Sequence, residues 1–435
     1  MKISLFQGIL MGVCIIAALL GLFVFSSYTA KNSGSNAVGT VAVWGTLPSN
    51  GMKATLTAAT QIDQSLKGVV YTEKDPATLP SDLASAIATG AAPDLVLASQ
   101  EELLPLSKFI SPIPLATLPA NTFQSTFAEE AAIYAAPGGV GYFGIPFLID
   151  PLVLFSNRGI LSSSGVAKPP ATWESLTGLV PNVAQFSPSE QILRGLIALG
   201  TYGNVHDARG ILSTLFLQTS VPVTKYSSTG LLDVDLGSQE TSGVPPGQAV
   251  LRFYTQFADP SKVSYTWNGS LPDSQQSFLA GDLALYLGYA SEARFLKAAN
   301  PNLDFTVAPV PQPATARSKV VYGLAYAFMI PRGAKNSSGA YTAAVLLSNP
   351  AEQAAASANT GLAPASLTEL AGRPADPIAA VAYAEALYAK GWLSPLPTLV
   401  DPVFSSMITN VTSGRTTLTT ALSLAEQSLA ALLSQ

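Results

Sequence analysis

The chain has 435 residues, of which 48% are hydrophobic and 11% charged, and its 22 Lys and Arg against 27 Asp and Glu give a net charge of −5. Soluble domains usually carry roughly 25% charged residues, so charge is sparse here. This composition excludes a disordered chain, which needs low hydrophobicity and high net charge, and a nucleic-acid binder, which needs clustered Lys and Arg. At roughly 150 residues per domain, the length favours two or three domains.

The N-terminus carries a long apolar run. Leu5–Phe25 contains Gln7 as its one conspicuously polar residue, and as a helix it would span about 31 Å, enough to cross a bilayer. Later apolar runs are shorter or are broken by Pro, Gly, Asp or Asn. We therefore expect residues 1–27 to form an uncleaved transmembrane anchor, in preference to a cleaved export signal. Residues 28–39 are small and polar, which is typical of a flexible linker.

The folded body begins with alternating strand and helix patterns. Residues 41–44 are a short β-branched run and predict a strand, as do residues 68–72 and 95–97. Helical spacing of apolar residues predicts helices over residues 51–66 and 81–90. Strands that alternate with helices over about 60 residues are typical of a parallel, doubly wound α/β sheet.

The remainder continues in the same α/β style. Short strands are predicted at residues 150–155, 282–287, 305–309 and 320–330. Helices are predicted at residues 172–176, 189–199, 208–219, 246–257, 274–280 and 290–299, and repeatedly after residue 340, where Ala and Leu dominate. No repeat of fixed period appears, which argues against a solenoid or a propeller.

Catalytic and cofactor signatures are scarce. His206 is the single histidine and Cys14, inside the apolar run, is the single cysteine, so we expect no N/S-ligand metal site and no cofactor. His206 itself is interpreted as a solvated or capping residue. Residues 139–144 match G-x-G-x-x-G, but Pro146 follows where a nucleotide-binding helix would have to continue. We interpret this segment as a glycine-rich turn and short strand that lead into a domain crossing.

Carboxylates leave an enzymatic alternative open. Glu101–Glu102 and Glu129–Glu130 are sequence neighbours on expected helices, so we interpret both pairs as solvated helix faces. Asp150 and Asp401 lie in apolar, Pro-containing contexts and are better candidates for a cleft. An exported glycosidase-like hydrolase would need two such carboxylates facing each other about 5–9.5 Å apart.

Several segments, in order, resemble a known family. They are V-A-V-W-G at residues 41–45, A-P-D-L-V at 92–96, G-I-P-F-L-I-D-P-L-V-L-F-S-N at 144–157, P-P-A-T-W-E at 169–174 and F-L-A-G-D-L-A-L-Y-L-G at 278–288. Their order and spacing resemble the extracellular solute-binding proteins of ABC importers, in the sugar-binding group that includes maltose-binding proteins. The resemblance covers nearly all of residues 40–435.

The resemblance implies an α/β, two-lobed periplasmic-binding-protein-like fold with doubly wound sheets and hinge crossings, after one N-terminal transmembrane helix. The expected lobe 1 spans about residues 40–145 plus 310–345, and lobe 2 about 150–305 plus 350–435. The resemblance also implies a monomer that performs no catalysis. This monomer would capture a small polar solute such as a sugar and deliver it to ABC permease subunits. The body would lie outside the cytoplasm. A surface sensor or adhesion module with the same fold is a further alternative.

The resemblance also implies which residues face the ligand. Carried over residue by residue, the expected ligand-binding residues are Trp44, Asp94, Tyr142, Asp150, Trp267, Tyr289, Gly323 and Phe404. For Asp94, a helix-capping role is an equal alternative. Maltose binders have a second aromatic residue after the position of Asp94, where this chain reads L-V-L-A-S. Peptides and other polar solutes therefore stay open as ligands.

Overall fold

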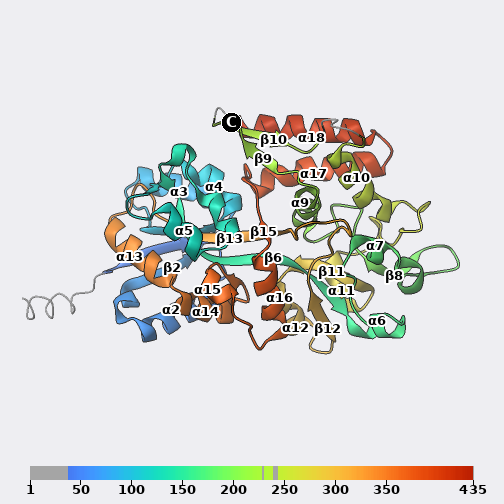
Figure 1. Ribbon diagram of the computed structural model, residues 1–435, viewed down its shortest axis with the longest axis horizontal. Helices are drawn as coiled ribbons and strands as arrows, with labels where there is room; N and C mark the ends of the chain where they lie inside the picture. The colour runs from blue at the N-terminus through green and yellow to red at the C-terminus, as the bar shows by residue number, and fades with distance from the viewer. Residues whose placement is uncertain (1–37, 228–229, 239–242, 435) are drawn as a thin grey trace, which may run out of the picture.

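The computed structural model describes residues 38–227, 230–238 and 243–434 and shows two lobes side by side (Figure 1). The strands are β1 (Val41–Gly45), β2 (Val69–Glu73), β3 (Leu95–Ser99), β4 (Ile113–Pro114), β5 (Gly141–Tyr142), β6 (Gly144–Asn157), β7 (Gln185–Phe186), β8 (Ile192–Ile197), β9 (Val223–Tyr226), β10 (Leu232–Asp235), β11 (Leu283–Tyr289), β12 (Phe305–Ala308), β13 (Val321–Met329), β14 (Ala363–Pro364) and β15 (Ala389–Lys390).

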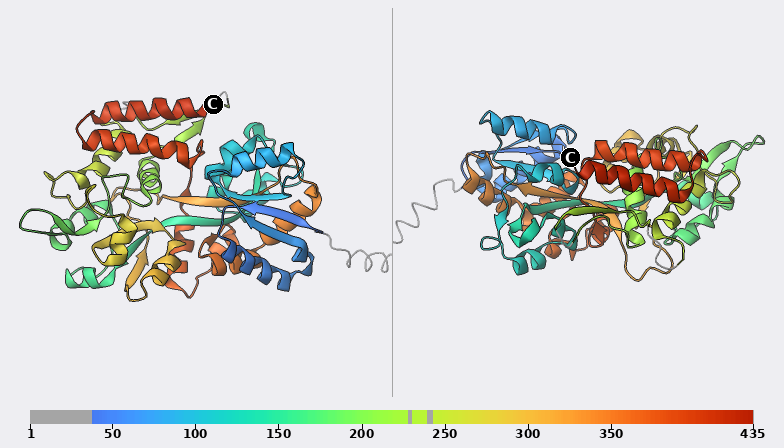
Figure 2. Two further views of the ribbon diagram at one scale, coloured as in Figure 1. Left: turned by 180° about the vertical axis from the view of Figure 1, so that it is seen from behind. Right: turned by 90° about the horizontal axis from the view of Figure 1, so that it is seen from above.

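Helices cover both faces of the strands in each lobe (Figure 2). The α-helices are α2 (Ser49–Ile62), α3 (Leu79–Ala88), α4 (Gln100–Ser107), α5 (Ala120–Thr126), α6 (Arg158–Ser163), α7 (Trp173–Thr177), α8 (Val180–Val183), α9 (Ala208–Gln218), α10 (Pro246–Thr255), α11 (Ser274–Ala280), α12 (Glu292–Ala299), α13 (Ser337–Leu347), α14 (Pro350–Thr360), α15 (Leu367–Leu370), α16 (Pro377–Ala386), α17 (Pro397–Thr412) and α18 (Leu418–Leu433). Short 3₁₀ helices are η1 (Gln64–Gly68), η2 (Glu129–Tyr134), η3 (Pro137–Gly139) and η4 (Gln256–Ala258).

The expected anchor, residues 1–27, and most of the expected linker, residues 28–39, lie outside the described residues. Within the described ranges, no helix has both the length and the apolar character that a membrane crossing requires.

One sheet runs through both lobes, with the strand order β2-β1-β3-β13-β6-β11-β8-β7. β1 is parallel to β2 and β3, and β11 is parallel to β8. In contrast, β13 is antiparallel to β3 and β6, and β11 is antiparallel to β6. The sheet is therefore mixed and continuous, where the sequence analysis expected doubly wound parallel sheets. The reason is that β6 and β13 run between the lobes in opposite directions.

The crossing strand β6 forms the centre of the molecule. All 14 of its residues are buried, as expected of a nearly unbroken apolar run that is covered on both faces. Pro146 has no N–H to donate, and the β13 partner strand shifts register beside it, between Tyr326 and Ala327. The glycine-rich segment 139–144 passes through η3 and β5 into this strand, which confirms its interpretation as a turn before a crossing.

The C-terminal third of the chain is divided between the lobes. α14 packs against α2, and β14 pairs with the first half of β6, at Leu148 and Ile149. Residues 350–364 therefore lie with the first lobe, where the sequence analysis placed them in the second. α17 and α18 pack on each other and on α10 of the second lobe.

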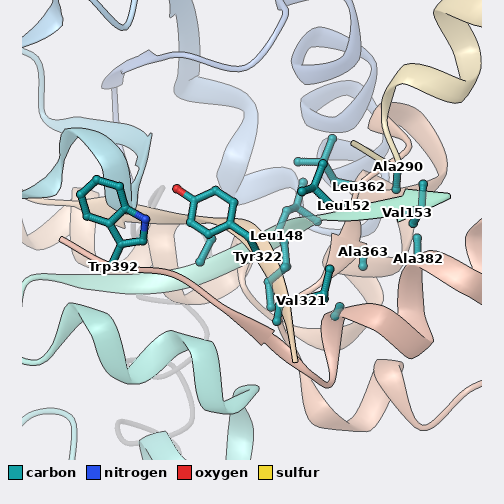
Figure 3. Close-up of a cluster of buried hydrophobic side chains, with 14 of the residues drawn as sticks. Leu148, Leu152, Val153, Ala290, Val321, Tyr322, Leu362, Ala363, Ala382 and Trp392 are labelled. Atoms are coloured by element: carbon teal, nitrogen blue, oxygen red, sulfur yellow. The ribbon is translucent and has the colours of Figure 1, made fainter. Parts of the chain in front are cut away.

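The buried core is continuous across the crossing. Figure 3 shows side chains of β6, β13, β14 and α16 packed together there, beside Trp392 from the segment that follows β15. Trp392 is 2% exposed and its Nε1 donates to Ser213 Oγ at 2.9 Å. The hinge strands therefore connect the two lobes through packed side chains as well as through backbone pairing.

Candidate functional site

An ion pair joins the two lobes beside β13. Arg209, in the first turn of α9, donates from Nη2 to Glu101 Oε2 at 2.8 Å and from Nε to Glu101 Oε1 at 3.1 Å, while Glu101 begins α4 of the first lobe. Arg209 Nη1 also donates to Asp401 Oδ1 at 2.7 Å. A two-bond Arg–carboxylate contact fixes orientation as well as charge. This pair is therefore a specific contact between α4 and α9.

Two tyrosine hydroxyls complete this arrangement. Tyr322 donates to Glu101 Oε1 at 2.5 Å, and Tyr202 donates to Asp401 Oδ1 at 2.6 Å. Burial, and then the charge of Glu101, raise the pKa of the Tyr322 hydroxyl well above its usual value, so it remains a neutral donor. We call Glu101, Tyr202, Arg209, Tyr322 and Asp401 the interlobe cluster.

Local sequence explains why Glu101 reaches this place. Ser99 ends β3 and caps α4, and Glu102 accepts hydrogen bonds from the Ser99 N–H and Oγ at 2.9 and 2.7 Å, which forms a capping box. Burial, and then the charge of Glu101, raise the pKa of Glu102 to about 7. α4 follows β3, and α9 follows β8, so both helices begin at the carboxyl ends of strands. Ligands of open α/β sheets bind at these ends.

A cavity of about 250 Å³ opens beside the cluster on the side of the second lobe. Its walls include the Tyr289 ring, and the hydroxyl of Tyr289 lies so close to α9 that a Cβ at Gly210 would be 2.9 Å from it. Small-molecule sites usually enclose about 300–1,000 Å³. This cavity is therefore smaller than the usual range for small-molecule sites.

Carboxylates lie in the wall of this cavity and next to it. Glu292 Oε2 accepts from Tyr286 at 2.5 Å and from Gln275 at 2.6 Å, and its Oε1 accepts from the Tyr289 N–H at 2.6 Å. Burial, and then the charge of Glu292, raise the pKa of Asp207 well above its ordinary value. Asp207, Asp273 and Asp401 line the cavity with Arg209, and Glu292 contacts Tyr289 of its wall. Even with a neutral Asp207, these carboxylates outnumber Arg209, so we expect the cavity to disfavour anionic solutes.

His206, Asp207 and Glu292 have ligating atoms within 4.8 Å of one another, which is the spacing of a metal site. Both oxygens of Glu292 already accept hydrogen bonds from the protein, and His206 lies 3.5 Å from Asp273. We therefore interpret the three side chains as a hydrogen-bonded cluster, of which His206 and Asp207 line the cavity.

Of the expected ligand-binding residues, Tyr289 lines the cavity and Asp150 is not among its lining residues. Asp150 is 5% exposed, and its oxygens accept from the Ser291 N–H at 3.1 Å and from the Ser291 hydroxyl at 2.6 Å. Burial raises the pKa of Asp150 to about 7 despite these hydrogen bonds. Asp150 thus anchors β6 to the turn before α12.

Trp44 is partly exposed at the end of β1, and Lys74 Nζ lies 3.9 Å from its ring centroid. This cation–π contact holds the indole at the surface of the first lobe. Trp44 is not among the residues that line the 250 Å³ cavity.

Two expected ligand-binding aromatics are core residues. Phe404 is 0% exposed and packs against Phe216 and Trp392, each with a ring-centroid distance of 6.3 Å. Trp267 is 1% exposed. The structure therefore buries both side chains, which the sequence analysis expected to face the ligand. Their burial comes from residues distant in the sequence, as the contacts of Phe404 with Phe216 and Trp392 illustrate.

Three further expected residues also have structural roles. Tyr142 stacks on Phe123 at 3.7 Å between centroids, inside the first lobe. A Cβ at Gly323 would lie 3.0 Å from the Ala389 side chain, so this glycine allows β15 to pack closely against β13. Asp94 accepts from the Ala42 N–H at 3.0 Å and the Asn336 N–H at 2.9 Å, which ties α13 to β1.

Sequence reasoning missed the central pair. Glu101 and Glu102, interpreted as solvated, are 3% and 4% exposed, and Arg209 was not considered. The Ser99-x-x-Glu102 spacing directly after a buried strand was an available signal, because a capping box there puts Glu101 at a strand's carboxyl end. Asp401, favoured for a cleft, does line the cavity.

The fold has many solved relatives. It resembles a cyclo/maltodextrin-binding protein complexed with maltotetraose (TM-score 0.71, 17% identity, 90% of this chain and 96% of that chain). It also resembles a cyclic α-maltosyl-1,6-maltose-binding protein from Arthrobacter globiformis (TM-score 0.73, 15% identity, 91% of this chain and 98% of that chain). A third similar structure is the GacH receptor of Streptomyces glaucescens, solved with and without acarbose (TM-score 0.68, 17% identity, 91% of this chain and 99% of that chain).

Sequence comparison gives the family. No protein of curated function matches the chain. The family model described as bacterial extracellular solute-binding protein matches residues 50–384. This match confirms the resemblance drawn from the sequence segments. The chain belongs to the bacterial extracellular solute-binding protein family.

Proposed function

We propose that the chain is the substrate-binding component of an ABC importer and that it captures a neutral carbohydrate between its lobes. Family membership supports solute capture outside the cytoplasm. The similar folds of proteins solved with maltotetraose and acarbose support a carbohydrate as the solute. The apolar run at residues 5–25 and the linker after it would attach a monomeric body to the cell surface; this part of the proposal rests on the sequence alone.

The Arg209–Glu101 pair is the observation that carries the proposal. Sugar hydroxyls both donate and accept hydrogen bonds, and here a fork of N–H donors meets carboxylate acceptors from the opposite lobe. The Tyr289 ring adds an aromatic wall on which a pyranose face can stack. When the lobes separate, a sugar can bind Arg209 and Glu101 in place of their mutual contact, and closure then encloses it.

The test measures binding of defined solutes to the full-length chain by isothermal titration calorimetry. The panel contains glucose, maltose, maltotetraose, a cyclodextrin, glucuronate, amino acids and dipeptides. We expect a neutral sugar to bind and glucuronate not to bind, because acidic residues outnumber Arg209 in the wall of the cavity. Binding of dipeptides without any sugar would contradict the carbohydrate assignment, and release of smaller sugars from the panel, measured by chromatography, would support the hydrolase alternative.

A matched pair of arginine variants locates the site. Arg209→Gln removes a charged donor whose hydrogen bonds are each worth about 1.5–3 kcal/mol, so the dissociation constant of the bound sugar should rise at least tenfold. Arg158→Gln is the control, because Arg158 forms an exposed pair with Asp304 at 3.6 Å. Equal affinities in the two variants would place the sugar elsewhere.

A further inference from the structure

A second cavity lies among helices of the second lobe, with Pro313 from the segment before β13 in its wall. Its volume is about 700 Å³, within the range of small-molecule sites, and it opens between α7, α9 and α10, which Figure 1 shows together in that lobe. It is remote from the interlobe cluster: Arg209 begins α9, whereas Leu215 and Gln218 of the cavity wall lie at the opposite end of that helix. A helical rise of 1.5 Å per residue separates Arg209 from Gln218 by about 13 Å.

The floor of this cavity is apolar and aromatic. Trp173 and Phe253 meet edge to face, with ring centroids 5.4 Å apart and an interplanar angle of 62°. Leu215 and Val250, 4% and 3% exposed, close the floor between them. A flat apolar group can pack against these four side chains, and burial of such a group from water is favourable at roughly 25 cal/mol per Å².

The polar atoms of the floor are already used by the protein. Gln218 Oε1 accepts from Trp173 Nε1 at 2.7 Å, and Gln218 Nε2 donates to the carbonyls of Pro311 and Val320, both at 3.0 Å. These bonds fix the Trp173 ring in place. They also use both polar atoms of the Gln218 amide, so this side chain cannot bind a polar group of the ligand.

A positively charged side chain, Lys262, lies at the rim of the cavity. Lys262 is exposed, and the ion pairs found among the described residues do not include it. The acid on the opposite rim, Glu174, already accepts from the Ala314 N–H through Oε2 at 3.0 Å. Next to Lys262, Val263 is 79% exposed and extends the apolar surface to the edge of the cavity.

We propose that this cavity is a second ligand site, which binds a small amphiphilic anion with an aromatic or alicyclic ring. The ring packs on Trp173 and Phe253, and the acidic group is held at Lys262. This ligand is opposite in kind to the neutral, hydroxyl-rich solute proposed at the interlobe cluster, so the two sites do not compete.

The probe is 2-naphthoate, and its neutral counterpart is 2-naphthylmethanol; each is titrated calorimetrically into the full-length chain. We expect 2-naphthoate to bind at one site, and the alcohol to bind at least fivefold more weakly. Lys262→Glu and Val263→Asp should each weaken 2-naphthoate at least tenfold. Lys53→Glu and Val140→Asp, which change exposed residues of the first lobe, should have no effect. Because all four side chains are exposed, these variants should fold.

Three outcomes would overturn the proposal: no saturable binding of 2-naphthoate, equal affinity for the alcohol, or an undiminished affinity in the Lys262 and Val263 variants. Arg209→Gln separates this proposal from the carbohydrate site. It should leave the affinity for 2-naphthoate within twofold, whereas a tenfold loss would show that the naphthoate binds at the interlobe cluster.

Discussion

Glu130 is a buried acid at the segment that crosses between the lobes. It is 4% exposed, and its Oε2 accepts from the Gly391 N–H at 2.7 Å. Its Oε1 has no hydrogen-bond partner among the described residues. Burial raises the pKa of Glu130 from 4.5 to about 8, against the smaller opposing effects of the Gly391 N–H and the charge of Lys390. Glu130→Gln keeps the shape of the protonated acid but cannot ionise.

Proton binding by Glu130 determines whether the free energy of unfolding rises or falls with pH. Between pH 4.5 and 8 the folded chain holds a proton on Glu130 and the unfolded chain does not, so the contribution of this group to stability is complete below pH 4.5 and is lost as the pH rises to 8. At about 1.4 kcal/mol per pH unit, the full loss is roughly 5 kcal/mol, and we expect about 3–5 kcal/mol after local relaxation. Glu130→Gln should abolish this loss.

Urea unfolding followed by tryptophan fluorescence at pH 5, 6, 7 and 8 measures the effect. The free energy of unfolding of Glu130→Gln minus that of the wild type should grow steadily with pH. Other buried acids titrate equally in both proteins and cancel in this difference. The control is Glu129→Gln, because Glu129 is exposed and pairs with Lys390 at 2.6 Å. The free energy of unfolding of Glu129→Gln minus that of the wild type should not grow with pH as it does for Glu130→Gln. A Glu130→Gln difference that is the same at every pH would refute the reasoning.

Two further predictions concern the interlobe site. Phe404→Ala should lower the free energy of unfolding by about 3–5 kcal/mol, measured in urea, because it empties a fully buried position; its sugar affinity at low temperature should stay unchanged. A selective loss of affinity would instead put Phe404 in contact with the ligand. Gly210→Ala places a methyl group 2.9 Å from the Tyr289 hydroxyl and should weaken sugar binding severalfold in calorimetry. Gly269→Ala, where a Cβ meets no atom within 4 Å, is its control, and equal affinities in the two variants would show that the position of Tyr289 is unimportant.

Local pattern was enough for many elements. The helix predicted over residues 208–219 is α9, Ala208–Gln218, and the apolar run after the glycine-rich segment is the crossing strand β6. These elements follow from periodicity, propensity and an unbroken apolar run, which are properties of neighbouring residues. The family could be inferred for the same reason, because its segments keep their order along the chain.

The direction of strand pairing needed the tertiary structure. β3 contacts β13, whose partner residues lie more than 200 positions away, for example Ala98 beside Ala327. Nothing near either strand specifies that neighbour, and the local alternation of strands and helices is the same for a purely parallel sheet and for this mixed one. The position of α14 in the first lobe depends in the same way on its contact with α2.

By itself, the sequence determined the α/β class, the long buried crossing strand, the solute-binding family and the absence of a nucleic-acid-binding composition. Only the tertiary structure decided which polar residues meet between the lobes. Glu101 and Arg209 are 108 positions apart, and each begins a helix that looks ordinary in sequence. Their pairing depends on two helices from different lobes that both pack against β13. Phe404 is likewise buried by contacts between distant segments. A local pattern contains neither contact, because both form only when distant segments fold against one another.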